Sequence, residues 1–313
     1  MPAAFDRFCR CDIGDSMSNL RHLHPTSVIA IDGGGTRCRL ALITESQPVL
    51  IEGGSVNVTS NFDAAVRELS RGLAALAQKA GLTTSDLAAL PTYAGLAGVM
   101  DQGMAQKVTA ALPQTHIRVE DDRPAALRGA LGTTDGVVAH CGTGSFIAAQ
   151  VAGRTRFAGG WGAVLGDPTS AQWVGRRALT LTLEVVDGLR ATSALSDRLL
   201  AKFTGCAGIV AFAATARPSD FGALAPAVTE HALTDDAIAC KIMNEAAEDI
   251  TALLPKLGWT PGMALCLTGG IGPHFAPYLP DSIAANVTAP QGEPLSGAFE
   301  LAQMYRDELS NGT

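Results

Sequence analysis

The chain has 313 residues and a mass of 32.2 kDa, with 23 Lys and Arg against 30 Asp and Glu, a formal net charge of −7 and a pI near 5.3. With 47% hydrophobic and 17% charged residues, a chain of this length can bury a large core, which excludes both a single small module and global disorder. The acidic balance argues against a nucleic-acid partner, because binding to phosphate backbones depends on a basic surface. A small-molecule ligand is expected instead.

The mean hydropathy of +0.20 makes a membrane span worth testing. The longest stretch without a charged side chain, 257–280, is interrupted by several prolines and glycines and cannot form one continuous helix in lipid. Residues 1–15 contain Asp and Arg side chains and lack the apolar segment of a signal peptide. We therefore expect no membrane partner and a cytoplasmic location.

Seven cysteines occur, and no two of them form a C-x-x-C pair, so neither a disulfide framework nor a structural zinc site is expected. Residues 1–26 are predicted to be a flexible leader, and Met17 is an alternative start. The nearest approach to a set of metal ligands lies in this leader, where its polar surroundings do not favour metal binding: Cys9, Cys11, His22 and His24.

Ordered structure is predicted to begin at Ser27. An apolar run over 28–31, a glycine turn and a second apolar run over 40–43 indicate a β-hairpin, and a third strand is predicted over 49–51. Helical spacing of apolar residues follows from Phe62 to Ala80. Two further strands, over 89–98 and 116–119, are predicted on either side of a helix over 102–112.

An internal repeat then appears, because residues 28–36 can be laid without gaps on residues 137–145. A second hairpin after a helix, a strand and a helix is expected if one α/β unit occurs twice. We therefore place a domain boundary near 132–136 and predict an N-terminal domain over 27–134 and a C-terminal domain over 135–313.

The second half is predicted to be richer in helices. Ranges 171–189 and 237–254 have helical patterns, and 191–239 is an Ala-rich helical insertion broken at two prolines. A buried strand over 263–267 precedes a third glycine turn, and the last helix, over 295–309, can pack back on the N-terminal domain.

Three Gly-rich turns, over 32–36, 142–145 and 268–272, each follow an apolar strand. Glycine reaches positive φ and lets backbone N–H groups approach an anion closely, so consecutive amides can hold a phosphate. One such turn is more often a tight hairpin, but three of them favour a nucleotide. A P-loop is excluded because no Gly-Lys pair occurs, and a Rossmann turn is disfavoured because strand-like sequence follows the first two turns.

These turns resemble the phosphate-1, phosphate-2 and adenosine motifs of the actin-like ATPase superfamily. With Gly159–Gly162 and Leu165–Asp167 close behind the second turn, residues 27–305 resemble the N-acetylglucosamine kinase branch of the BadF/BadG/BcrA/BcrD ATPase family. The resemblance implies an α/β fold of two RNase H-like domains, with ATP in a cleft between them. It assigns phosphate binding to the first two turns and adenosine binding to the third: Gly33, Gly34, Gly35, Thr36, Gly142, Thr143, Gly144, Ser145, Gly269, Gly270 and Gly272.

Phosphoryl transfer to an alcohol needs a carboxylate to accept the proton and a magnesium ion to neutralise phosphate oxygens. Asp122 follows a predicted strand and opens a helix, where the general base of the family would lie; the alternative role is a helix N-cap, and the two roles are compatible. Adjacent Asp121 competes for the catalytic role. Asp32 is predicted to hold Mg²⁺ through water, against the alternative of stabilising its own turn.

The resemblance also implies three sugar-binding residues. Asn57 would bind sugar or cap its loop, Asp167 would accept hydrogen bonds from sugar hydroxyls, and Trp161 would lie along the sugar or pack in the core. One departure stands out, because the family commonly has Gly-Asp-Glu-Gly-Ser where this chain has Pro168 and Thr169 after Gly166-Asp167. The missing glutamate puts the identity of the sugar in doubt.

The leading hypothesis is an ATP-dependent kinase that phosphorylates glucosamine or N-acetylglucosamine at the 6-hydroxyl. A second hypothesis is an activator ATPase of a dehydratase or reductase, which would need cysteines that ligate an iron–sulfur cluster; Cys141 and Cys266 are poorly placed for that role. A sugar-responsive regulator is least favoured, because the leader is too short for a DNA-binding module. The family resemblance also predicts a homodimer.

Overall fold

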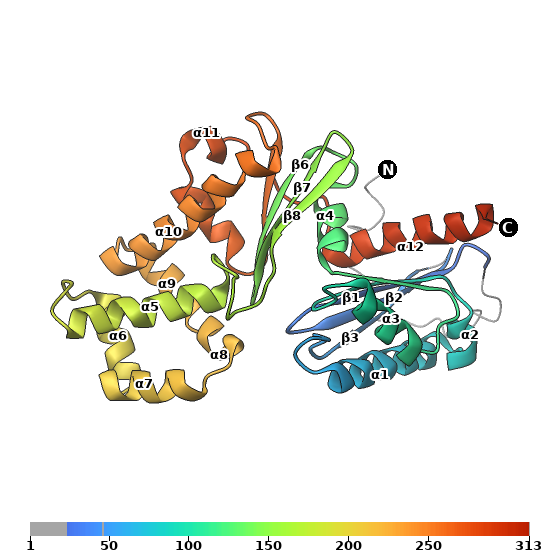
Figure 1. Ribbon diagram of the computed structural model, residues 1–313, viewed down its shortest axis with the longest axis horizontal. Helices are drawn as coiled ribbons and strands as arrows, with labels where there is room; N and C mark the ends of the chain where they lie inside the picture. Colours follow the sequence, from blue (N-terminus) through green and yellow to red (C-terminus); the bar gives the residue numbers. More distant parts are fainter. Residues whose placement is uncertain (1–23, 46, 313) are drawn as a thin grey trace. The chain divides into compact units, whose positions relative to one another are not determined.

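The computed structural model describes residues 24–45 and 47–312, which form two units (Figure 1). Of the described residues, those up to Thr134 and those from Pro290 onward form the first unit, and Asp135–Ala289 form the second. Only residues 24–26 of the expected leader are described, so Cys9, Cys11, His22 and the alternative start at Met17 lie outside the described residues. The cleft implied between two domains stays a prediction.

The first unit is built on a five-stranded sheet in the order β3-β2-β1-β4-β5. The antiparallel hairpin and the third strand are confirmed, and β4 and β5 run parallel to β1. Strand β4 is shorter than expected, because Pro91 has no N–H to donate to a ladder and Gly98 turns the chain with φ of 87°. The strands are β1 (Val28–Gly33), β2 (Cys38–Ile43), β3 (Val49–Gly53), β4 (Thr92–Leu96) and β5 (Ile117–Glu120).

Helices cover both faces of this sheet, because alternate residues of β1 are apolar on both sides. Ile29 and Ile31 pack in the core formed with α1 (Phe62–Ala80), and Val28 and Ala30 pack in the core formed with α12 (Pro294–Asn311). Helix α1 has the predicted bounds. The remaining helices are α2 (Thr84–Ala88), which the sequence reading missed, α3 (Gln102–Ala111) and α4 (Arg123–Leu131).

Helix α12 belongs to the first unit and crosses α4 closely. A Cβ on Gly297 would lie 2.0 Å from the carbonyl oxygen of Ala125, and one on Gly129 would lie 2.2 Å from that of Glu293. Glycine at both positions lets the two backbones touch. The second unit ends at Ala289, and the apolar face of α12, which the sequence analysis allowed to pack back on the N-terminal domain, is buried in the first unit.

The second unit repeats the arrangement with a four-stranded sheet in the order β8-β7-β6-β9. Strands β6 and β7 form the predicted second hairpin, β9 runs parallel to β6, and β8 is an edge strand that the sequence reading missed. The strands are β6 (Gly136–Cys141), β7 (Ser145–Val151), β8 (Arg154–Gly159) and β9 (Ala264–Thr268).

The predicted helical insertion consists of several short helices, with Pro218 and Pro226 in the first turns of two of them, as their missing N–H groups allow. The helices are α5 (Ala171–Val186), α6 (Ala194–Lys202), α7 (Cys206–Thr215), α8 (Pro218–Gly222), α9 (Ala225–Ala232), α10 (Ala237–Leu253) and α11 (Asp281–Ala284). Within the described residues no single helix is long and apolar enough to cross a membrane, although α6 and α7, bent by 69°, pass that test as a pair.

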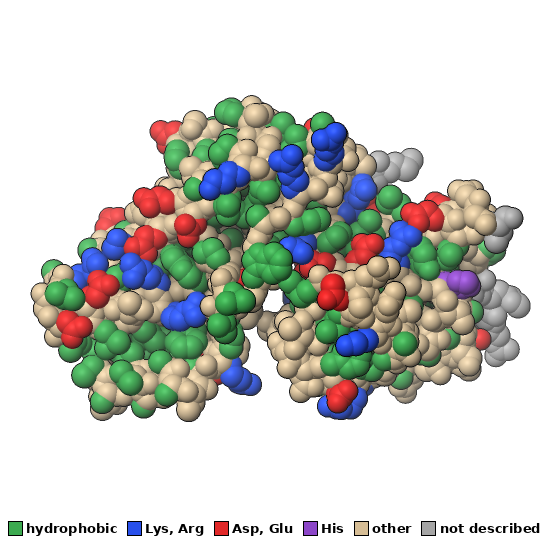
Figure 2. All heavy atoms as spheres, in the orientation of Figure 1, with side chains coloured by type: hydrophobic (Ala, Val, Ile, Leu, Met, Phe, Trp, Pro, Cys, Tyr) green, Lys and Arg blue, Asp and Glu red, His purple; other side chains and the backbone are tan. Residues whose placement is uncertain are grey.

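The surface carries charges of both signs. On the face shown in Figure 2, acidic and basic side chains are interspersed with apolar and uncharged ones.

Candidate active site

The phosphate-1 turn (residues 32–36) is held by neighbouring backbone. The carbonyl of Gly33 accepts from Ala97 N at 2.7 Å and that of Gly34 from Val56 N at 2.9 Å. Gly33, Gly34 and Gly35 all lack positive φ, so the expectation that this turn needs glycine for a left-handed backbone is wrong. Close approach explains Gly33, whose added Cβ would lie 2.7 Å from a Leu96 methyl; around Gly35 the space is open. Gly35 and Thr36 are exposed.

Asp32 ends β1 beside a positive charge. Arg39 lies opposite it in the β1–β2 pairing and donates to Asp32 Oδ2 from Nη2 at 2.7 Å and from Nε at 3.2 Å. Burial raises the pKa of Asp32, and the Arg39 charge opposes that effect. Arg39 also pairs with Glu293, the residue before α12.

The two aspartates before α4 have different surroundings. Asp121 Oδ1 accepts from Arg123 N at 2.8 Å and from Arg123 Nε at 2.7 Å, so Asp121 caps the helix. Asp122 stands at the N-cap position, but its side chain makes no capping hydrogen bond, so the N-cap alternative for Asp122 is wrong. Burial, followed by the negative charges of Asp121 and Asp32, raises the pKa of Asp122 to about 8. A carboxyl with that pKa suits proton transfer near neutral pH.

Asn57 follows β3 and bridges to Ala97, beyond the end of β4. Its side-chain oxygen accepts from Thr59 N at 3.2 Å and from Ser60 N at 3.0 Å, which is the loop-capping arrangement. A sugar contact by Asn57 stays a prediction.

In the second unit, the phosphate-2 turn (residues 142–145) and the adenosine turn (residues 268–272) lie in contact. Ile271 N donates to Cys141 O at 3.1 Å. Gly269 has φ of 78°, and an added Cβ would lie 2.4 Å from Cys141 C and O and 2.7 Å from Gly142 N. Only glycine fits at this position. Gly270 has no atom within 4 Å of such a Cβ, so its backbone borders open space.

A strained loop over 159–170 lies against the phosphate-2 turn. Asp167 is 5% exposed, and its carboxylate accepts from the backbone N–H of Gly162, at 3.1 Å, and of Ser145. Burial raises the pKa of Asp167. Asp167 and Thr169 have φ of 58° and 71°, conformations that non-glycine residues rarely adopt and that concentrate at functional sites. The carboxylate therefore fixes this loop, and its contact with sugar stays a prediction.

Trp161 lies in the same loop and is 64% exposed, which excludes the alternative that it packs in the core. A large aromatic ring held at the surface is available to a ligand. The neighbouring side chains Val164 and Leu165 are exposed as well. The Ser145 hydroxyl donates to the carbonyl of Pro168, so the proline that replaces the family glutamate lies against the phosphate-2 turn.

Sequence reasoning missed His140, which precedes the phosphate-2 turn. Its Nδ1 lies 3.1 Å from Thr268 Oγ1, and its ring stacks on Phe146. Burial lowers the pKa of His140 to about 4, so the ring is neutral at physiological pH. A signal was present, because His140 aligns with Ile31 in the repeat and is polar at an apolar strand position.

Each unit thus gathers a part of the predicted site. The first holds the phosphate-1 turn, Asp32 and Asp122, and the second holds the phosphate-2 turn, the adenosine turn and the strained loop. Among the described residues, no three His, Cys, Asp or Glu side chains form a group that could hold a metal. Mg²⁺ is commonly bound by one or two carboxylates, with waters and substrate phosphates as its other ligands. A single carboxylate at Asp32 fits an ion bound in that way and not one held by protein ligands alone.

A profile of the BadF/BadG/BcrA/BcrD ATPase family matches residues 29–298, which include all of the predicted site residues. The chain belongs to this family. A glucosamine kinase of Vibrio cholerae is 27% identical over 290 residues, which cover 90% of this chain and 99% of the relative. Members of the BadF/BadG/BcrA/BcrD ATPase family are named as ATPases, so ATP is the nucleotide implied for this chain.

Solved structures extend the likeness. A protein of Chromobacterium violaceum, provisionally assigned as an N-acetylglucosamine kinase, is 31% identical with a TM-score of 0.78, over 88% of this chain and 98% of that one. A glucokinase of the ROK family from Streptomyces griseus, solved with glucose and AMPPNP, has 18% identity and a TM-score of 0.53, over 89% of this chain and 99% of that one. The likeness to the Streptomyces griseus glucokinase concerns the fold alone. The expected α/β fold of two related halves is confirmed.

The buried cysteines do not favour the alternative hypothesis of an activator ATPase with an iron–sulfur cluster. Cys38, Cys141 and Cys266 are buried, and burial raises the pKa of the Cys141 thiol to about 12, so it stays protonated. Cluster ligands are deprotonated thiolates. Cys141 occupies the repeat position that corresponds to Asp32, so the strand-end carboxylate is present in the first half alone.

Proposed function

We propose that the protein is an ATP-dependent kinase of an amino sugar, glucosamine or N-acetylglucosamine. The proposal rests on the surroundings of Asp122 at the start of α4. Its side chain makes no capping hydrogen bond, and burial together with the charges of Asp121 and Asp32 raises the pKa of its carboxyl. The similarity to a glucosamine kinase over nearly the whole of both chains supports the substrate class.

In the proposed reaction the 6-hydroxyl oxygen of the sugar attacks the γ-phosphorus of ATP. A new O–P bond forms while the bond from the γ-phosphorus to the β,γ-bridging oxygen breaks, and ADP leaves. The hydroxyl proton passes to the Asp122 carboxylate. Asp121 cannot serve equally well, because its oxygen already accepts two hydrogen bonds from Arg123.

The glycine turns would bind the nucleotide through main-chain amides. We assign the phosphates to residues 33–36 and 142–145 and the adenosine to Gly269, Gly270 and Gly272. Mg²⁺, when bound, neutralises phosphate oxygens, and Asp32 would hold it through water. Arg39 orients the Asp32 carboxylate through its hydrogen bond, and its positive charge opposes the effect of burial on the pKa of Asp32.

On the sugar side we assign Asn57, Trp161 and Asp167. Asp167 acts chiefly by fixing the strained loop, since its carboxylate already accepts two main-chain hydrogen bonds. The exposed ring of Trp161 offers an apolar surface to a face of the sugar ring.

A panel of hexoses that differ only at carbon 2 tests the proposal. Glucosamine, N-acetylglucosamine and glucose are assayed with MgATP by coupled ADP release, and phosphorus NMR locates the phosphate on the product. We expect a higher kcat/KM for at least one amino sugar than for glucose, and a product that carries the phosphate on the 6-oxygen. A 6-deoxy analogue of that amino sugar, which lacks the accepting hydroxyl, should not be turned over. ADP release that no hexosamine stimulates would overturn the proposal.

A homodimer and a cytoplasmic location are also proposed, on the family resemblance alone. Sedimentation velocity of the full chain tests the first, and fractionation of the source cells tests the second.

A further inference from the structure

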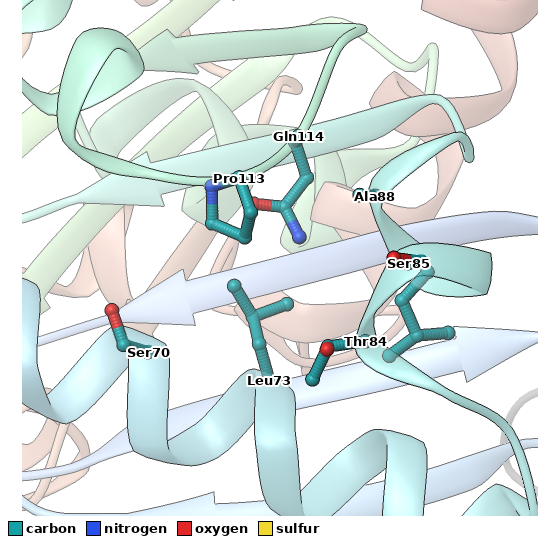
Figure 3. Close-up of a pocket in the computed structure, with 8 residues that line it drawn as sticks. Ser70, Leu73, Thr84, Ser85, Ala88, Pro113 and Gln114 are labelled. Atoms are coloured by element: carbon teal, nitrogen blue, oxygen red, sulfur yellow. The ribbon is translucent and has the colours of Figure 1, made fainter.

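A pocket lies in the first unit and shares no residue with the candidate active site. It has a volume of about 400 Å³ and lies beside the middle of α1, α2 and the segment that leads into β5 (Figure 3). This volume is within the usual range of small-molecule sites, roughly 300–1,000 Å³.

Gln114 is one of the residues that line this pocket, and its side-chain amide is buried and unpartnered. The residue is 6% exposed, and neither Nε2 nor Oε1 has a hydrogen-bond partner among the described residues. Figure 3 shows the amide pointing toward Leu73, with Thr84 and Ala88 nearby. Buried amides in native proteins nearly always have partners, because an unmade hydrogen bond costs the full desolvation of the group. No described residue supplies the donor and the acceptor that the burial of the Gln114 amide calls for.

The lining defines the chemistry of the missing partner. Hydroxyl groups of Ser70, Thr84 and Ser85 contribute polar atoms, Leu73 and Leu87 contribute apolar surface, and none of the lining residues is charged. An ion would lose hydration there without gaining a counter-charge. Ordered water could meet the hydroxyl groups but not the leucine side chains, so a ligand with both a polar and an apolar part matches the lining more fully.

We propose that this pocket binds a small uncharged molecule that carries a carboxamide. The NH₂ group of the ligand would donate to Gln114 Oε1, and its carbonyl would accept from Nε2. The apolar part would lie on Leu73 and Leu87, within reach of the Ser and Thr hydroxyls. Since both amide atoms are shielded in the structure, a rotation of the Gln114 side chain must accompany binding.

Benzamide is a suitable probe, with benzoate as a charged molecule of the same shape and toluene as one without polar atoms. Saturation-transfer NMR on the full chain measures each Kd. A molecule of this size is expected to bind in the millimolar range. We expect benzoate and toluene to bind at least about tenfold more weakly, which corresponds to the loss of one or two neutral hydrogen bonds.

Two variants locate the binding. Gln114→Leu removes the amide at similar volume and should raise the benzamide Kd about tenfold. Ser70→Phe fills the pocket from the exposed surface of α1 and should abolish binding, whereas Ala74→Phe, one turn further along on the same helix and outside the pocket, should not. Circular dichroism confirms that each variant is folded, and the Ser70 and Ala74 pair still tests the site if Gln114→Leu does not fold.

Three results would overturn the inference. They are equal affinity for benzoate and benzamide, binding that survives Ser70→Phe, and no detectable binding of benzamide by the wild-type chain, which would leave water as the occupant.

Discussion

Substitution of Gly269 by alanine tests how the adenosine turn is held against the phosphate-2 turn. At this position φ is 78°, and the new Cβ would lie 2.4 Å from the carbonyl carbon and oxygen of Cys141. Both neighbouring atoms are backbone, so neither can rotate away. The Cβ can be accommodated only if β6 and the adenosine turn separate.

The size of the effect follows from two contributions. Left-handed backbone costs a non-glycine residue about 1–2 kcal/mol, and overpacking costs about 1–3 kcal/mol. Together they lower the free energy of unfolding by roughly 3 kcal/mol, which corresponds to roughly 6–12 °C in Tm for a unit of this size.

Thermal unfolding and a titration with a non-hydrolysable ATP analogue measure the two consequences. Gly270→Ala is the matched control, because its φ is not positive and its Cβ would meet no atom within 4 Å. We expect Gly269→Ala to lower Tm and weaken nucleotide binding, and Gly270→Ala to leave Tm unchanged. Equal Tm values for Gly269→Ala and the wild type would refute the reasoning.

Three further predictions concern charged groups. Burial raises the pKa of Asp122 to about 8, and only the ionised carboxylate can accept a proton. The kcat/KM for the sugar should therefore rise with pH up to about 8 and then level, whereas a profile that is flat from about pH 6 to about pH 9 would contradict this reasoning. Two hydrogen bonds from Arg177, together with a contact from Lys241, lower the pKa of Glu245 to about 2. The stabilisation by this carboxylate is therefore present above pH 4.5 and is lost as the pH falls through about 2. In urea unfolding at neutral pH, the free energy of unfolding of Glu245→Gln should be about 1–3 kcal/mol lower than that of the wild type. The difference should shrink as the pH falls below 4.5, and a difference that stays the same in acid would count against the ion pair. Asp167→Asn keeps a residue that tolerates positive φ but removes the charge and one acceptor, so unfolding free energy should fall by about 1–2 kcal/mol and sugar kcat/KM should fall with it; unchanged values for both would show that the strained loop does not depend on this carboxylate.

Much of the fold was predictable because strong local signals agree with it. Apolar runs that end in glycine turns gave both hairpins, and α1 has the predicted bounds because Asn61 caps its start and Gly81, with φ of 70°, ends it. The elements that were missed lack those signals. The first half of edge strand β8 is polar and exposed, so the strand lacks an apolar run. Helix α2 has only about one turn, although its capping box of Thr83 and Asp86 could have revealed it.

The glycine turns were predictable in position, but the contacts of their side chains were less so. The motifs mark the ends of strands, where main-chain amides are available, so the turns could be located from the sequence. Which of two adjacent aspartates caps α4 depends on side-chain direction, and only the structure shows that Asp121 does so. The contacts of Asp167 join a loop to a hairpin turn, and no spacing in the sequence encodes that contact.

The most direct test of the account compares Asp122→Asn with Asp121→Asn in turnover of an amino sugar with MgATP. If Asp122 accepts the hydroxyl proton, Asp122→Asn should lower kcat by about 10²–10⁴-fold while nucleotide affinity stays close to that of the wild type. Asp121→Asn should keep most of the activity, because that side chain serves the start of α4. Wild-type kcat in Asp122→Asn would contradict the central claim.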